Sequence, residues 1–103
     1  MIHEIHHVTA FEQVGDFTLK LDFDDGTSQT IDFAPILRGQ LFGPLADPEF
    51  FRQVRLNTDF DTIEWPNGAD FDPANLHDWP EVRDDFIKLA QSWAPAPASP
   101  VSR

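Results

Sequence analysis

Apolar and polar residues alternate most regularly between residues 17 and 24. The apolar face of this segment consists of Phe17, Leu19, Leu21 and Phe23. A period of two residues is typical of a β-strand that buries one face. After the turn residues Asp24-Asp25-Gly26, residues 27–33 resume a strand-like pattern, which predicts a hairpin.

The pairing of this hairpin depends on the length of its loop. A two-residue turn at Asp25-Gly26 would place Leu19 opposite Asp32 and so mix the apolar and polar faces. A three-residue loop over 24–26, with Gly26 at positive φ, instead pairs Leu19 with Ile31 and keeps the faces separate. We therefore predict the three-residue loop.

The remaining elements of the first two thirds of the chain are short. Residues 1–11 contain several β-branched side chains and predict an edge strand, and a second hairpin is expected within residues 55–65. Pro35 ends the preceding strand, so we expect one helical turn around 36–37 and then a connecting stretch through 43–44. The pattern predicts an α+β fold with a small antiparallel β-sheet, short helices and a C-terminal helix.

Helix starts are marked by two Asp-Pro pairs, because Asp caps free N–H groups and Pro suits the first helical position. The pairs are Asp47-Pro48 and Asp72-Pro73. A helical period follows Pro80, with an apolar stripe formed by Val82, Phe86, Leu89, Ala90 and Trp93. This last helix either covers the domain's own core or docks a partner, and we expect it to cover the core.

Length and composition indicate one domain. The chain has 103 residues, 41% of them hydrophobic, and no cysteine that would supply a disulfide or a thiolate metal site. We expect a single α+β domain over 1–93 and a disordered tail over 94–103, which is rich in Pro, Ala and Ser. Because no signal-peptide pattern and no long apolar run is visible, we expect a cytoplasmic protein.

Net charge narrows the class of partner. Eighteen acidic side chains stand against seven basic ones, which gives a net charge of −11. Such a surface repels phosphate backbones and anionic lipids, so we expect neither nucleic acid nor a membrane as a partner. A small basic protein is the partner that this charge favours, although an acidic composition also serves solubility alone. The sequence leaves the oligomeric state open.

The densest run of turn and cap residues lies between residues 62 and 73. It reads Thr62-Ile63-Glu64-Trp65-Pro66-Asn67-Gly68-Ala69-Asp70-Phe71-Asp72-Pro73. Together with Phe23-Asp24-Asp25-Gly26-Thr27 and Leu45-Ala46-Asp47-Pro48-Glu49-Phe50-Phe51, this run is similar to the small bacterial proteins of the domain-of-unknown-function 2442 family. The resemblance covers about residues 1–77.

The resemblance implies a compact α+β domain with an antiparallel sheet and a bacterial source, and it implies no established activity. Some relatives are encoded beside a second small protein in pairs that look like toxin–antitoxin systems, and some carry an attached helix-turn-helix domain. We expect no such attached domain here, because only one helix follows the motif. This chain also has His77 where relatives often have Tyr.

Candidate ligands for a metal ion are few. Three histidines stand close together near the N-terminus: His3, His6 and His7. On a strand, His3 and His7 would share a face and so hold an ion between them. The alternative is that the spacing of these histidines is incidental. Three carboxylates of the motif, Glu64, Asp70 and Asp72, either gather for Ca²⁺ or acid–base chemistry or serve as turn and cap residues. The structural interpretation is favoured in both cases, so we expect no cofactor, no metal site and no catalytic residue.

The sequence therefore favours a non-catalytic protein-interaction module, in its most specific form the antitoxin-like member of a two-gene pair. The alternatives are a DNA-associated regulatory domain and a carboxylate-based enzyme or metal-binding protein. The candidate interaction surface is formed by Glu64, Asn67 and Asp70, because a well-specified turn presents side chains rigidly and lowers the entropy cost of binding. The competing interpretation is that Asn67 and Asp70 serve only their own backbone.

Overall fold

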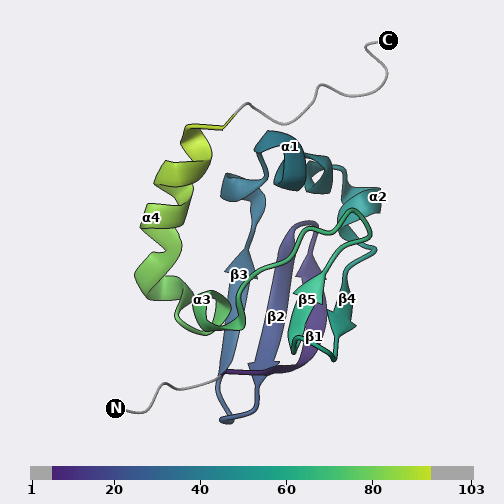
Figure 1. The fold of residues 1–103 in the computed structure, drawn as a ribbon, viewed down its shortest axis with the longest axis vertical. Coiled ribbons are helices and arrows are strands. Elements are labelled where there is room, and N and C mark those ends of the chain that lie inside the picture. The colour runs from purple at the N-terminus through teal and green to yellow at the C-terminus, as the bar shows by residue number, and fades with distance from the viewer. Residues whose placement is uncertain (1–5, 94–103) are drawn as a thin grey trace.

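A computed structural model describes residues 6–93 of the chain. Two antiparallel sheets are formed in that range (Figure 1). The larger sheet has the strand order β1-β2-β3, with β1 (Val8–Gly15), β2 (Thr18–Phe23) and β3 (Ser28–Asp32), and the smaller one pairs β4 (Arg55–Asn57) with β5 (Thr62–Glu64). This arrangement, with the helices that follow, confirms the α+β class.

Helical segments connect and cover the strands. Two are 3₁₀ turns, η1 (Ala34–Ile36) and η2 (Gly43–Ala46), and four are α-helical: α1 (Gly39–Phe42), α2 (Pro48–Phe51), α3 (Pro73–His77) and α4 (Trp79–Gln91). The cap residues that begin α2 and α3 are those expected from the sequence, because the side chain of Asp47 accepts from the N–H of Glu49 and that of Asp72 from the N–H of Ala74.

The first hairpin has the register predicted from its faces. Leu19 lies opposite Ile31, and the N–H of Phe23 donates to the carbonyl of Thr27 at 2.9 Å, which closes a loop of three residues. Gly26 in that loop has a φ of +87°, a conformation that favours glycine because it carries no Cβ. Leu19 and Ile31 are buried on the inner face of the sheet.

Two of the sequence expectations are wrong in detail. The N-terminal edge strand runs from Val8 to Gly15, not over residues 1–11, and residues 1–5 lie outside the described part of the chain. The stretch through 43–44, expected only to connect, contains the helix α1 and the 3₁₀ turn η2. The expected hairpin within 55–65 is formed as β4 and β5.

Aromatic rings fill the centre of the core. The fully buried ring of Phe33 has four aromatic neighbours with ring centroids 5.1 to 6.2 Å away: Phe51, Trp65, Phe71 and Trp79. The indole Nε1–H of Trp65 donates to the carbonyl of Phe51 at 2.9 Å, so the polar atom of this buried side chain is satisfied. The sheet, the 62–73 motif and α4 are thus joined through one cluster.

Helix α4 packs on the domain's own core, as expected. Its Trp79 and Ala90 are buried, and the ring of Phe86 lies 5.8 Å from that of Phe71. The expected stripe is wrong for Leu89, which is 53% exposed. The tail expected over 94–103 lies outside the described residues.

A tight turn shapes the Trp-Pro-Asn-Gly motif. The N–H of Gly68 donates to the carbonyl of Trp65 at 3.0 Å, and the N–H of Trp65 donates to the carbonyl of Ala69 at 2.9 Å. Gly68 has a φ of +89°, and the side-chain oxygen of Asn67 accepts from the N–H of Ala69. The turn carries the chain from β5 to the extended segment that ends at the cap of α3.

Candidate functional site

Three histidines and four aspartates meet at one end of the molecule. This end contains the β2–β3 loop, the start of β1, the β4–β5 loop and the α3–α4 junction, and it lies opposite α1 (Figure 1). The residues, which we call the histidine–aspartate cluster, are His6, His7, His77, Asp24, Asp25, Asp61 and Asp78. No sequence motif places them together, because they come from segments up to 72 residues apart, the separation between His6 and Asp78.

His77 is the centre of this cluster. It ends α3, and its ring is held between two carboxylates: Nδ1 lies 2.9 Å from Asp78 Oδ1, and Nε2 lies 2.7 Å from Asp25 Oδ2. Its side chain is 19% exposed. Hydrogen bonding to Asp78 and then to Asp25 raises the pKa of His77, and it outweighs partial burial, which acts in the opposite direction.

The carboxylate of Asp25 is also held by Thr27, independently of its contact with His77. Its Oδ1 accepts from the backbone N–H of Thr27 at 3.0 Å and from the Thr27 hydroxyl at 2.6 Å. These two bonds to Thr27, followed by the bond to His77, hold the pKa of Asp25 well below its usual range. Asp25 is thus an exposed residue of the hairpin turn whose carboxylate is also held against the end of α3.

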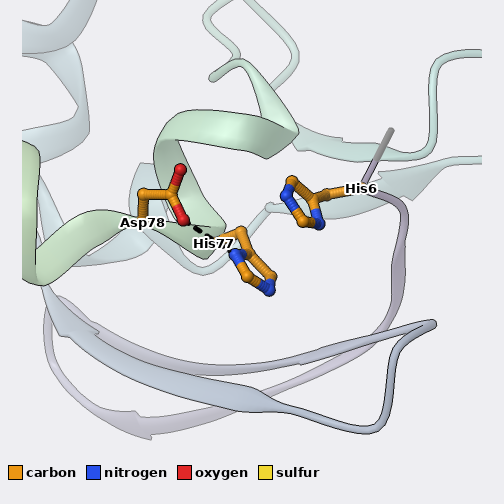
Figure 2. Close-up of side chains that lie close together, drawn as sticks. All are labelled: His6, His77 and Asp78. Atoms are coloured by element: carbon orange, nitrogen blue, oxygen red, sulfur yellow. Dashed lines mark hydrogen bonds and ion pairs between the residues drawn. The ribbon is translucent and has the colours of Figure 1, made fainter. Parts of the chain in front are cut away.

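His6 lies flat against His77. The two ring centroids are 3.6 Å apart and the ring planes differ by 10°, so the imidazoles are stacked (Figure 2). The edge of Phe23 contacts the same His77 ring, with centroids 5.1 Å apart at 77°. The ring of His77 is thus packed by His6 and Phe23 and hydrogen-bonded at both of its nitrogens.

His7 takes part in a separate pair of contacts. Its Nδ1 lies 2.6 Å from Asp61 Oδ2, and its Nε2 lies 3.9 Å from Asp24 Oδ2. The backbone is tied down at the same point, because the N–H of Val8 donates to the carbonyl of Asp61 at 2.9 Å. His6 and His7 thus have different partners, with His77 against the first and Asp61 and Asp24 against the second.

The histidine group expected near the N-terminus is not brought together as the sequence suggests. His3 lies outside the described residues, and β1 begins only after His7. Within the described range, the trio of side chains whose ligand atoms all lie within 4.8 Å of one another is His6, His77 and Asp78. The carboxylates of Glu64, Asp70 and Asp72 do not form such a group there.

Glu64 is occupied within the domain. Arg55 contacts Glu64 Oε2 at 2.6 Å, and the amide of Asn57 donates to Oε1 at 2.8 Å. Hydrogen bonds from Asn57 and then from Arg55 lower the pKa of Glu64. The side chain of Glu64 is 18% exposed, and its carboxylate joins β5 to β4.

Asn67 and Asp70 differ in their surroundings. The side-chain amide of Asn67 donates to the carbonyl of Leu41 at 2.9 Å, which ties the motif turn to α1. Asp70 is exposed and pairs through its backbone with Glu64 in an isolated β-bridge. Of the three surface residues named from the sequence, Asn67 and Asp70 are thus exposed, whereas the carboxylate of Glu64 is engaged by Arg55 and Asn57.

Sequence reasoning missed the role of His77. The adjacent pair His77-Asp78 and the acidic pair Asp24-Asp25 were visible signals. Their meeting depends on the path of the chain, however, since Asp25 and His77 are 52 residues apart. A hairpin loop that reaches an α3 terminus is a tertiary contact, and neither periodicity nor spacing reveals it.

Comparison with known proteins identifies the family. The sequence profile of a family described as a protein of unknown function (DUF2442) matches residues 8–80 of this chain. The chain belongs to the DUF2442 family. No match was found among curated proteins or among solved structures. In this DUF2442 protein, no helix within the described residues is long and apolar enough to cross a membrane.

Proposed function

We propose that this DUF2442 protein is a non-catalytic interaction module that binds a small basic protein, and that it acts as the antitoxin-like member of a two-gene pair. The observation that carries the proposal is an acidic hollow beside an exposed aromatic ring, on a chain with a net charge of −11. The partner would insert a Lys or Arg side chain into this hollow.

The hollow has a volume of about 380 Å³ and shares His6, His7 and Asp61 with the histidine–aspartate cluster. Its walls come from the segment before β1, the β4–β5 loop and the start of α3, namely His6, His7, Asp59, Phe60, Asp61, Asp72, Pro73 and Ala74. Three of these side chains are carboxylates, and the described lining contains neither Lys nor Arg. A cation entering the hollow therefore meets acidic groups from two separate loops.

Phe60 supplies the apolar part of the proposed contact. It is 71% exposed at the tip of the β4–β5 hairpin, which is unusual for a large aromatic side chain in a chain that buries most of its rings. An aromatic face beside carboxylates suits Lys or Arg, because the aliphatic stem packs on the ring and the charged head is attracted by both groups.

The acidic surface continues from the hollow to the motif turn. Asp70 and Asp72 are both exposed, on either side of the buried Phe71. Asp72 lines the hollow, and Asp70, which belongs to the surface formed by Glu64, Asn67 and Asp70, precedes it by two residues in the chain. We propose that one basic partner covers both areas, with the hollow as the centre of the contact.

Charge pairing within the domain supports the same class of partner. Among the described residues, Arg52, Arg55 and Arg83 pair with nearby carboxylates. Arg38 donates instead to the backbone carbonyls of Ala90 and Trp93. These four guanidinium groups are thus engaged within the domain. Their positions do not favour a continuous basic stripe of the kind that binds DNA.

The test is co-expression with the small protein encoded by the neighbouring gene, followed by purification of the complex and titration calorimetry. We expect Asp59→Asn combined with Phe60→Ala to weaken binding at least tenfold. The matched control is Asp85→Asn combined with Leu89→Ala on α4. It also removes one charge and one exposed apolar side chain, since Leu89 is 53% exposed. We expect the control to bind like the parent chain.

Two outcomes would contradict the proposal. A neighbouring product that is not basic, or that forms no complex, would remove the proposed partner. Equal loss of affinity in both double variants would show that binding follows overall charge and apolar area and not the hollow. Circular dichroism of each variant separates a loss of affinity from a loss of folded protein.

A further inference from the structure

Two imidazoles and a carboxylate converge where the segment before β1 reaches the α3–α4 junction. His6, His77 and Asp78 each offer a ligand atom, these atoms all lie within 4.8 Å of one another, and all three residues are partly buried (Figure 2). We propose that this trio binds Zn²⁺, with His77 Nδ1, one ring nitrogen of His6 and one Asp78 oxygen as ligands and water in the remaining position. This inference is independent of the proposed basic partner.

The ligand types select the class of metal. Imidazole nitrogens suit Zn²⁺ and neighbouring transition ions, whereas Ca²⁺ and Mg²⁺ prefer oxygen ligands throughout. Two imidazoles, one carboxylate and a water make the four-coordinate arrangement that Zn²⁺ commonly adopts in open sites. The abundant exposed carboxylates of this chain offer oxygen alone, so they lack the selectivity that the two imidazoles give the trio.

Asp25 is the feature that makes the trio more than a chance meeting. A histidine that binds metal through one nitrogen usually donates from the other to a carboxylate, which fixes its orientation and makes it a better ligand. His77 has this arrangement: Nε2 faces Asp25 Oδ2 at 2.7 Å while Nδ1 faces Asp78. Asp25 is itself held by the backbone N–H and the hydroxyl of Thr27.

The backbone of the site is fixed as well. The side-chain amide of Gln29 on β3 donates to the carbonyl of His77 at 2.8 Å, which secures the end of α3 to the sheet. The ring of Phe23 packs against His77 from the same sheet. His77 and Asp78 are consecutive residues, so two of the three proposed ligands are placed by one rigid junction.

Binding requires a local change at His6. Stacked rings hold their nitrogen lone pairs in two nearly parallel planes, whereas binding to one tetrahedral ion needs the lone pairs to converge on a point. Rotation of the His6 side chain out of the stack brings one nitrogen toward the Nδ1 side of His77. The bound ion would then link the start of β1 to the α3–α4 junction and stabilise the folded state.

The experiment titrates the full, tag-free chain with Zn²⁺ by calorimetry at neutral pH after removal of metal, with Mg²⁺ and Ca²⁺ as comparison ions. We expect one Zn²⁺ per chain and no comparable binding of the other two. Two adjacent histidines give a matched pair of variants, because His6→Gln removes a proposed ligand and His7→Gln does not. We expect at least tenfold weaker binding for His6→Gln and less than a twofold change for His7→Gln.

A second pair of variants tests the role of Asp25 separately. His77→Gln should abolish the site, and Asp25→Asn should weaken Zn²⁺ binding by about 10- to 100-fold without removing a ligand. If His77→Gln does not fold, His6→Gln still tests the Zn²⁺ site, because His6 lies before the first strand and its replacement leaves the sheet and the helices intact. Co²⁺ in place of Zn²⁺ should give the visible absorption of a four-coordinate site, and that absorption should be lost in His6→Gln.

The proposal is overturned if Zn²⁺ binds no more tightly than Mg²⁺ or Ca²⁺. It is also overturned if His6→Gln and His7→Gln change the affinity equally, since the ion would then be held by the general acidic surface or by the His7 pair. Neither result bears on binding of a basic protein at the hollow.

Discussion

Replacement of Trp65 by Ala tests the aromatic core most severely. The side chain is 1% exposed, and its ring lies 5.3 Å from that of Phe51, 6.0 Å from Phe71 and 6.2 Å from Phe33 between centroids. Truncation of a buried aromatic residue to Ala costs about 3–5 kcal/mol of stability. Because single domains are stable by only about 5–15 kcal/mol, we expect Trp65→Ala to lose a large share of that stability.

Trp65→Phe separates the two parts of this loss. The replacement keeps a ring and removes the indole hydrogen bond to the Phe51 carbonyl, which is 2.9 Å long. That carbonyl also accepts from the N–H of Val54, so the variant does not leave it without a partner. We expect Trp65→Phe to cost about 1–2 kcal/mol, from one hydrogen bond and some lost packing.

Urea unfolding followed by circular dichroism measures these differences. Phe60→Ala is the matched control, because Phe60 is a large aromatic residue that is 71% exposed, and we expect it to change stability by less than about 0.5 kcal/mol. A loss below about 1 kcal/mol for Trp65→Ala, or one equal to that of Phe60→Ala, would refute the assignment of Trp65 to the core.

Three further predictions concern the hairpin loop, His77 and the motif turn. Gly26→Val should lower the free energy of unfolding in urea by about 1–3 kcal/mol. No atom lies within 4 Å of an added Cβ, so the loss comes from backbone strain at the φ of +87° and not from a clash, and an unchanged midpoint would contradict the three-residue loop. Because the pKa of His77 is raised in the folded state, its contribution to stability is complete below its ordinary value of 6.5 and is lost as the pH rises through the folded-state pKa. In the presence of a metal chelator, NMR titration should give His77 a pKa above 6.5, and Asp25→Asn should lower that pKa. A His77 pKa at its ordinary value would contradict the contact with two carboxylates. Combined Glu64→Ala and Asn67→Ala should lower stability and also the partner affinity of the folded fraction, whereas unchanged affinity would show that both residues serve the fold alone.

Local sequence signals predicted those parts of the fold that local physics determines. The two-residue period of β2 and the need to separate faces determined the pairing of Leu19 with Ile31. The Asp-Pro pairs predicted the starts of α2 and α3, because a cap is a contact between near neighbours in the chain. These interactions need no knowledge of the rest of the molecule.

The parts that sequence reasoning missed depend on contacts between distant segments. Helix α1 begins at Gly39, which has a φ of +83° and packs so closely on Trp93, just after α4, that an added Cβ would lie 3.3 Å from it. Leu89 matches the helical period but falls outside the arc of α4 that faces the core. The histidine–aspartate cluster likewise forms only when the Asp25 loop reaches His77.

The proposed function is tested most directly by mapping the partner on the folded domain. Backbone N–H signals of the isotope-labelled chain would be followed by NMR while the proposed small basic partner is added. We predict that the largest shifts fall on the lining of the hollow, at residues 59–61, 72 and 74, and extend to Asp70. Shifts confined to the exposed face of α4, or no shifts at all, would contradict it.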